Sequence, residues 1–236
     1  MNEWLPPPRP LDLRSDQVHV WRIQLSSIPL NEDALSEAER QRAARFHFDK
    51  DRDRYIVSHA SLRDILSRYL QSEPHDLKFA ANEFGKPFLP DHNIEFNLSH
   101  SGDLGLIAVT RGRKVGVDIE LIREDIELEN LAARFFSPRE ISELMALTIE
   151  QRTRGFFNCW ARKEAYIKAH GLGLSLPLDS FDVSLDERAL LRATRPDADE
   201  ASRWMMLSLD TNSGYAGAVA VQGNNVDFKC WDWNRG

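Results

Sequence analysis

Apolar and polar residues alternate along residues 18–25 (VHVWRIQL), which is the pattern of a strand that buries one face. Residues 51–70 place apolar side chains at helical spacing, and this predicts a long amphipathic helix. A second long helix is predicted over 150–169, where Gly171 supplies the signal for its C-terminal end. Other short apolar runs predict strands over 94–98, 104–110, 115–121, 181–185, 204–209 and 215–221.

The order of these elements repeats in the second half of the chain. Ser36 and Glu39 form a capping-box pattern before the first long helix, and Ser137 and Glu140 form the same pattern before the second. An offset of about 100 residues superposes the two halves, although no run of identical residues supports the match. The repeat therefore rests on the order of helix and strand signals.

This repeat predicts an α+β fold built from two similar halves, residues 1–112 and 113–236, related by a pseudo-twofold axis. Each half is expected to be a small, mostly antiparallel sheet packed with a long helix. A cleft between the halves is the natural place for a ligand, so we expect the active site there.

Composition narrows the possible partners. The formal net charge is −7 and the sequence pI is near 5.5, which argues against a nucleic-acid partner because phosphate binding needs a basic face. The two cysteines, Cys159 and Cys230, lack the CxxC spacing of a zinc site. The first residues lack a signal-peptide pattern, and no apolar stretch approaches the roughly 20 residues that cross a bilayer. We therefore expect a cytoplasmic protein with no membrane partner, and the internal duplication favours a monomer.

An acidic pair lies on the strand predicted over 115–121. Because strand side chains alternate, Asp118 and Glu120 project from one face, while Val117 and Ile119 point into the core. Two adjacent carboxylates repel each other unless a cation lies between them, and Mg²⁺ prefers oxygen ligands of this kind. The alternative is an exposed acidic strand face with no ligand.

The second long helix carries a stripe of three side chains with possible chemical roles. Trp160, Glu164 and Lys168 are spaced by four residues and therefore share one face of the helix. In one interpretation Glu164 is a third metal ligand and Lys168 faces a phosphate group. In the other interpretation these two side chains form an ordinary surface ion pair, worth about 0.3–0.5 kcal/mol.

A third group follows a predicted strand and runs into a turn, over residues 96–101 (FNLSHS). Ser99 and His100 can donate hydrogen bonds to a phosphate oxygen. The alternative is a histidine in an ordinary polar turn. Each of the three groups is weak evidence alone, but their order along the chain is specific.

The ordered set of motifs resembles the Sfp-type 4'-phosphopantetheinyl transferases. The resemblance extends over about residues 36–185, which is most of the chain. The matching pieces, in chain order, are Gly85-Lys86-Pro87, Phe96-Asn97-Leu98-Ser99-His100-Ser101, Gly116-Val117-Asp118-Ile119-Glu120, Arg134-Phe135-Phe136-Ser137, Trp160-x-x-Lys163-Glu164-Ala165-x-x-Lys168 and Gly171-x-Gly173-Leu174-Ser175-Leu176-Pro177-Leu178-Asp179-Ser180-Phe181.

The resemblance implies an Mg²⁺-dependent transfer of 4'-phosphopantetheine from coenzyme A to a serine of an apo carrier protein, with release of adenosine 3',5'-bisphosphate. Asp118, Glu120 and Glu164 would hold the ion in the second half, and the first half would hold the nucleotide end of coenzyme A. The implied catalytic residues are Glu140, Glu164, Lys168 and His100. The implied contacts to coenzyme A are Arg42, Arg54, Lys86, Ser99, His100, Lys163 and Lys168.

Two points stay open from the sequence. Glu140 matches a glutamate proposed in some members as the base for the attacking serine, whereas others are assigned a metal-bound water or a metal-ligating glutamate. In addition, a family lysine expected about three residues before Arg42 is Glu39 in this chain. Arg40 and Arg45 are the nearest basic residues that could replace it.

Two other functions use the same residues. A magnesium-dependent pyrophosphatase or nucleotide hydrolase would need the three carboxylates with water as the nucleophile. Release of adenosine bisphosphate from coenzyme A without a carrier would favour that class. A degenerate module that only binds a carrier or coenzyme A is the second alternative, and the intact carboxylate set argues against it.

Overall fold

A computed structural model of the chain describes residues 3–233 and shows an α+β protein with mostly antiparallel sheets. The helices are α1 (Glu37–Ala43), α2 (Asp49–Leu70), α3 (Leu128–Phe135), α4 (Pro138–Ala146) and α5 (Ile149–His170). The strands are β1 (Gln17–Gln24), β2 (Ala80–Ala81), β3 (Pro87–Phe88), β4 (Glu95–Ser101), β5 (Leu104–Thr110), β6 (Val115–Leu121), β7 (Phe181–Val183), β8 (Leu191–Thr194), β9 (Trp204–Leu209), β10 (Tyr215–Gln222) and β11 (Asp227–Trp233).

The two sheets share one strand order, which confirms the repeat expected from the sequence. The first sheet has the order β11-β1-β5-β4 and the second has β6-β10-β9. If β11 is left out, each sheet has three strands, and in both sheets the strand that comes last in the chain lies between the other two. All neighbouring strands in these two sets are antiparallel. The helices α2 and α5 are both 22 residues long and begin at Asp49 and Ile149.

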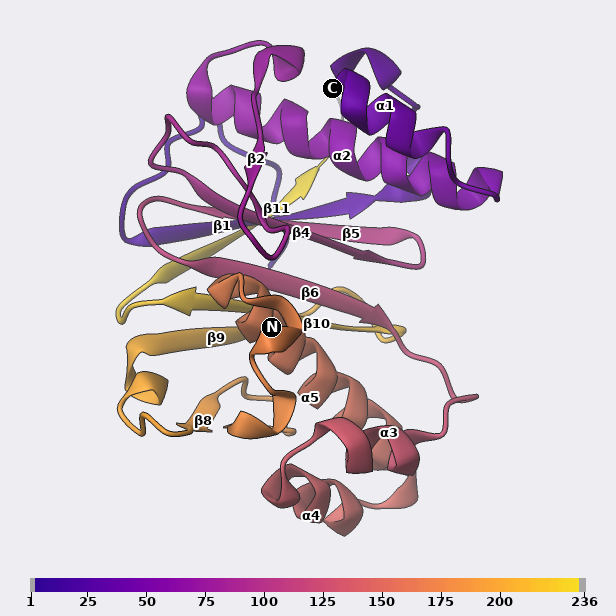
Figure 1. Ribbon diagram of the computed structural model, residues 1–236, viewed down its shortest axis with the longest axis vertical. Coiled ribbons are helices and arrows are strands. Elements are labelled where there is room, and N and C mark those ends of the chain that lie inside the picture. Colours follow the sequence, from indigo (N-terminus) through magenta and orange to yellow (C-terminus); the bar gives the residue numbers. More distant parts are fainter. Residues whose placement is uncertain (1–2, 234–236) are drawn as a thin grey trace.

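The molecule has four layers, with α2 on one outside face, the two sheets stacked in the middle, and α5 on the other outside face (Figure 1). The central core between the sheets is aliphatic and includes Val20, Leu106, Val117 and Val219. Each sheet therefore buries both faces, one against the other sheet and one against a long helix. No helix within residues 3–233 combines the length and apolar character that a membrane span requires.

The last strand returns to the first sheet. β11 pairs in parallel with β1, from Gln17 opposite Asp227 to Ile23 opposite Trp233. The sequence pattern did not predict this strand, nor α3 and β8. The boundary between the halves at residue 112 stays a prediction. The closing strand, β11, belongs to the second half of the sequence but lies in the sheet of the first half.

Helix α5 lies directly on strand β6 because Gly116 has no side chain. A Cβ atom built at Gly116 would lie 2.1 Å from the carbonyl oxygen of Ala165 and 2.3 Å from the amide nitrogen of Ala169. These are helix backbone atoms, which cannot move aside as a flexible side chain can. The glycine therefore sets how closely α5 approaches the acidic strand.

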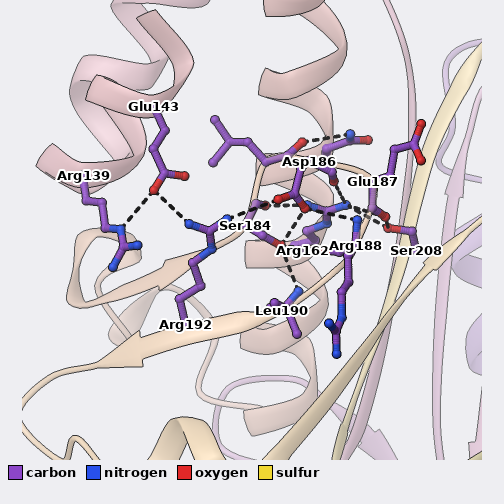
Figure 2. Close-up of polar contacts among 12 residues, drawn as sticks. Arg139, Glu143, Arg162, Ser184, Asp186, Glu187, Arg188, Leu190, Arg192 and Ser208 are labelled. Carbon is purple, nitrogen blue, oxygen red and sulfur yellow. Dashed lines mark hydrogen bonds and ion pairs between the residues drawn. The ribbon is translucent and has the colours of Figure 1, made fainter. Parts of the chain in front are cut away.

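A buried arginine of α5 holds the loop before β8 (Figure 2). Arg162 is 1% exposed and donates to the carbonyls of Ser184 and Asp186, at 2.5 Å each, and to the hydroxyl of Ser208 at 2.8 Å. Burial lowers the pKa of Arg162 to about 10. Ser184 Oγ in turn donates to the carbonyl of Arg188. Carbonyl and hydroxyl oxygens thus satisfy the guanidinium, and the loop is fixed to the helix.

Gly116→Ala is expected to lower the free energy of unfolding by about 1–3 kcal/mol or more, the usual cost of overpacking a core. Gly105→Ala in β5 is the matched control, because its added Cβ would meet no atom closer than 3.4 Å. Urea denaturation of both variants measures the difference. Equal stability of the two variants would contradict the close helix-to-strand contact.

Candidate active site

The edge strands β4 and β6 lie side by side in space but share no backbone ladder. Alternate side chains of β4 bridge them. The Asn97 Oδ1 atom accepts a hydrogen bond from the amide of Val117 at 2.8 Å, and Ser101 Oγ accepts one from the amide of Leu121 at 3.0 Å. Between them, Ser99 lies opposite the acidic pair of β6. We call this junction the seam.

Asp118 lies at the centre of the seam. Its Oδ1 atom accepts hydrogen bonds from Ser99 Oγ at 2.8 Å and from Lys168 Nζ at 2.5 Å. Burial opposes the positive charge of Lys168, but Asp118 outweighs burial, so the pKa of the ammonium is raised. Lys168 of α5 thus contacts the acidic strand itself, whereas the functional interpretation of the sequence has it facing a phosphate.

The three acidic side chains predicted as metal ligands lie within electrostatic reach of one another. Burial, followed by the charge of Asp118, raises the pKa of both Glu120 and Glu164. Asp118 itself is 2% exposed, and its buried Oδ2 atom has no hydrogen-bond partner. Within residues 3–233, no group of three or more acidic, histidine or cysteine side chains is arranged as a formed metal site. Here the ammonium of Lys168 is the cation in contact with Asp118.

A pocket of ≈ 270 Å³ opens beside one of these carboxylates, that of Glu164. Its lining includes Phe84, Lys86, Asn97, Glu164 and Lys168. The ammonium of Lys86 donates to the carbonyls of Val115 at 3.0 Å and Ala169 at 3.1 Å, and burial lowers its pKa to about 8. The Lys86 side chain therefore borders the pocket while its charged end ties the β2–β3 hairpin to α5 and β6.

The other predicted phosphate contacts lie on the α2 side of the seam. The side chain of His100 is exposed, and its pKa is lowered by partial desolvation and then by Lys168 and Arg54. Arg54 forms an ion pair with Asp103 at 2.7 Å. The guanidinium of Arg42 lies 5.5 Å from the ring centre of Tyr55. These three basic side chains therefore come from α1, α2 and β4 and remain candidates for phosphate binding.

Comparison with known proteins decides the family. Residues 114–220 match the 4'-phosphopantetheinyl transferase superfamily, and residues 19–111 match the family described as 4'-phosphopantetheinyl transferase, N-terminal. The 4'-phosphopantetheinyl transferase HetI of Nostoc sp. is 40% identical over 240 residues, which cover 98% of each chain. The 4'-phosphopantetheinyl transferase Sfp of Bacillus subtilis is 36% identical over 188 residues, covering 79% of this chain and 82% of the relative.

The chain belongs to the 4'-phosphopantetheinyl transferase superfamily. The resemblance expected from the ordered motifs is thereby confirmed. In this phosphopantetheinyl transferase some of the predicted site residues lie together and others lie apart. It brings Ser99, Asp118, Glu164 and Lys168 together at the seam.

The predicted site residues Glu140 and Lys163 lie elsewhere. Both side chains are 0% exposed, and they form an ion pair at 2.7 Å. Glu140 also accepts from the amides of Ser137 at 2.8 Å and Val183 at 2.7 Å. Lys163 donates to the carbonyls of the turn after α5, which are those of Leu178 and Phe181. A fully buried and bonded pair cannot reach a substrate serine or a phosphate. This placement argues against Glu140 as the base and against Lys163 as a coenzyme A ligand.

The first half of the transferase contains the matching ion pair, which the sequence analysis missed. Glu39 completes the capping box with Ser36 and accepts from Arg63 at 2.7 Å. Arg63 also donates to the carbonyls of Pro74 at 2.8 Å and Leu77 at 3.0 Å. Glu39 therefore has a structural role, because it caps α1 and pairs with Arg63. A lysine at this position could make neither of these contacts. The signal was present in the sequence, because Arg63 and Lys163 occupy the same position on α2 and α5.

Glu140→Gln is expected to lower the free energy of unfolding by about 3–5 kcal/mol, because it leaves the charge of Lys163 buried without its partner. The double variant Glu140→Gln/Lys163→Met removes both charges and should recover most of that stability. Chemical denaturation measures both changes. If Glu140→Gln folds with unchanged stability but loses transfer activity, the structural role is wrong and a role as the base is restored.

Proposed function

We propose that this protein transfers 4'-phosphopantetheine from coenzyme A to a serine of an apo carrier protein. The observation that carries the proposal is the buried Asp118, whose Oδ2 atom has no partner, whose charge acts on Glu120 and Glu164, and whose Oδ1 atom is bonded to Lys168 of the pocket wall. A buried carboxylate oxygen without a partner is costly, and a bound cation would remove that cost. Membership of the family supports the same reaction.

The donor set fits Mg²⁺. Asp118, Glu120 and Glu164 offer only oxygen atoms, which suit this ion. Burial, and after it the charge of Asp118, raises the pKa of each glutamate, and a divalent ion would neutralise that charge. These three residues would hold the ion, and it would supply charge neutralisation at the pyrophosphate of coenzyme A. A shift of the Lys168 ammonium from Asp118 to a phosphate would leave Oδ1 bonded to Ser99 alone and remove a competing cation from the carboxylate.

The remaining chemistry falls to side chains at the seam. Lys168 stabilises negative charge as it grows on the leaving phosphate oxygen, and His100 donates a hydrogen bond to the phosphates. Ser99 would do the same after its hydroxyl turns from Asp118 to a phosphate oxygen. The serine oxygen of the carrier forms a bond to the phosphorus that bears pantetheine. The bond from that phosphorus to the adenosine 3',5'-bisphosphate oxygen breaks. Because Glu140 is buried, the proton of the serine passes to a glutamate of the carboxylate set or to a water molecule.

The nucleotide end of coenzyme A is assigned to the first half. Arg42 and Arg54 lie near Tyr55 and Asp103 and would meet the 3'-phosphate, while Lys86 borders the adenine side of the pocket. Arg54 would exchange its ion pair with Asp103 for the phosphate. The net charge of −7 disfavours a nucleic-acid partner, and we propose that one copy of the chain suffices because its two halves form the site together.

Asp118→Asn is expected to lower transfer at least about 100-fold, because even second-shell partners of a metal site cost 10–100-fold. Calorimetric titration with Mg²⁺ should show loss of binding in this variant but not in Asp125→Asn, which changes an exposed loop residue. Near-normal transfer by Asp118→Asn would refute the proposed site.

Affinity for Mg²⁺ should rise with pH through the acidic range. The ion binds the charged carboxylates, and Glu120 and Glu164, whose pKa values are raised, must first lose their protons. Titrations at a series of pH values in buffers of different ionisation enthalpy measure the protons released. Affinity that does not change with pH would contradict the assignment.

Release of adenosine bisphosphate from coenzyme A without a carrier would instead favour a hydrolase.

A further inference from the structure

The turn between α1 and α2 exposes two large aromatic rings. Phe46 is 39% exposed and Phe48 is 65% exposed. Burying a phenylalanine side chain typically stabilises a protein by about 1.5–3 kcal/mol, and Phe48 forgoes most of that gain. Its ring contacts His47 edge to face at 4.8 Å between centroids, while Phe46 packs against Tyr55 at 5.3 Å.

Phe48 also occupies a position that the helix would use better with another residue. It is the N-cap of α2, and no side chain makes a capping hydrogen bond there. Serine, threonine, aspartate or asparagine at an N-cap stabilises a helix by about 1 kcal/mol. The capping boxes of α1 and α4 show that this chain uses such residues elsewhere. An exposed ring at this N-cap is therefore costly to the fold, which indicates a role in contact with another molecule.

Unpaired positive charge surrounds these rings. The side chains of Arg45 and Lys50 are exposed, and neither forms an ion pair with any residue in the described part of the chain. The acidic residue of the turn, Asp49, is engaged by Arg52 at 2.8 Å. The turn therefore presents net positive charge on a protein whose overall net charge is −7. We call Arg45, Phe46, Phe48 and Lys50 the aromatic–basic turn.

The aromatic–basic turn lies next to the proposed active site. Tyr55, which contacts Phe46, stacks on His59 with ring centroids 3.9 Å apart. Burial is the largest of the effects that lower the pKa of His59 to about 4, and the nearby charge of His100 adds to it. The charge of Lys50 likewise acts on Asp103, at the turn that follows β4. A molecule on this surface would therefore sit at the His100 end of the seam.

We propose that the aromatic–basic turn is the docking surface for the acidic protein partner, which in the proposed function is the apo carrier. This inference rests on that function and adds the place where the carrier binds. Two exposed aromatic rings between two free cations complement a surface with acidic side chains around an apolar patch. Local charge of this kind speeds the encounter, and buried aromatic rings supply most of the affinity.

The test compares transfer kinetics of Phe48→Ser and of Lys50→Glu with the unmodified protein, using a purified apo acyl carrier protein. Each variant is expected to raise the KM for the carrier at least tenfold, while kcat and the KM for coenzyme A stay within twofold. Added salt should weaken carrier binding by the unmodified protein, because it screens attraction, and should strengthen carrier binding by the charge-reversed variant, because it screens repulsion.

Matched controls come from the second half of the chain. Ile149 is 77% exposed at the start of α5, the position that corresponds to the start of α2. Ile149→Ser and Arg188→Glu should leave both KM values unchanged. The melting temperature of every variant is measured first, and the charge reversal involves only an exposed side chain, so it keeps the test valid if Phe48→Ser unfolds.

The outcomes separate the docking surface from the reaction. A raised KM for coenzyme A with an unchanged KM for the carrier would assign the turn to the nucleotide and overturn the inference, as would unchanged values for both. If the unmodified protein transfers nothing, the proposed function fails, and calorimetric binding of the apo carrier without coenzyme A decides the docking surface. Binding by the unmodified protein that the variants lose supports it, and equal binding or no binding overturns it.

Discussion

A largely buried ion pair fixes the long helix in each half of this protein, and the pair in the second half involves Lys163, the neighbour of Glu164. Glu39 binds Arg63 in the first half, Glu140 binds Lys163 in the second, and both distances are 2.7 Å. Each basic residue also donates hydrogen bonds to carbonyl oxygens of the turn beyond its helix. One cationic side chain thus connects the capping box, the long helix and the following loop. Buried pairs add little net stability compared with apolar residues, but breaking one is expensive, and this makes the arrangement specific. Because Lys163 is held inside, its neighbour Glu164 is directed toward the seam.

The seam shows how one set of side chains can join two sheets and form a reactive site. Two edge strands normally expose unpaired backbone groups, and here Asn97 and Ser101 of β4 satisfy those of β6. Side-chain bridging keeps the strands farther apart than a backbone ladder would, which leaves room for carboxylates between them. Asp118 Oδ1 accepts hydrogen bonds from Ser99 and Lys168, whereas Oδ2 accepts none. The fold thus holds a desolvated negative charge in the place where the proposed cation would stabilise it.

Local patterns predicted much of this structure, and contacts between distant segments explain what they missed. Alternation and helical spacing identified the long helices and the strands β1, β4, β5, β6, β9 and β10, and the two capping boxes are present in the structure. The same spacing placed Glu164 and Lys168 on one stripe. The same spacing indicates that Lys163 does not share the face of Glu164, because successive residues of a helix are rotated by about 100° about its axis. The pairing of β11 with β1, more than 200 residues apart, depends on the tertiary fold and has no local signal.

The two halves differ at the proposed active site. Asp64 and Arg68 occupy on α2 the positions that Glu164 and Lys168 occupy on α5. Arg68, however, lies 4.3 Å from the ring centre of Trp233, a residue that the closing strand β11 brings to this face. The first sheet packs aromatic side chains such as Trp21 and Trp233 against α2, whereas strand β6 of the second sheet carries the carboxylates Asp118 and Glu120. The corresponding surface of the first half is therefore covered as core, whereas that of the second half stays polar, which is consistent with placing the proposed cation site in the second half.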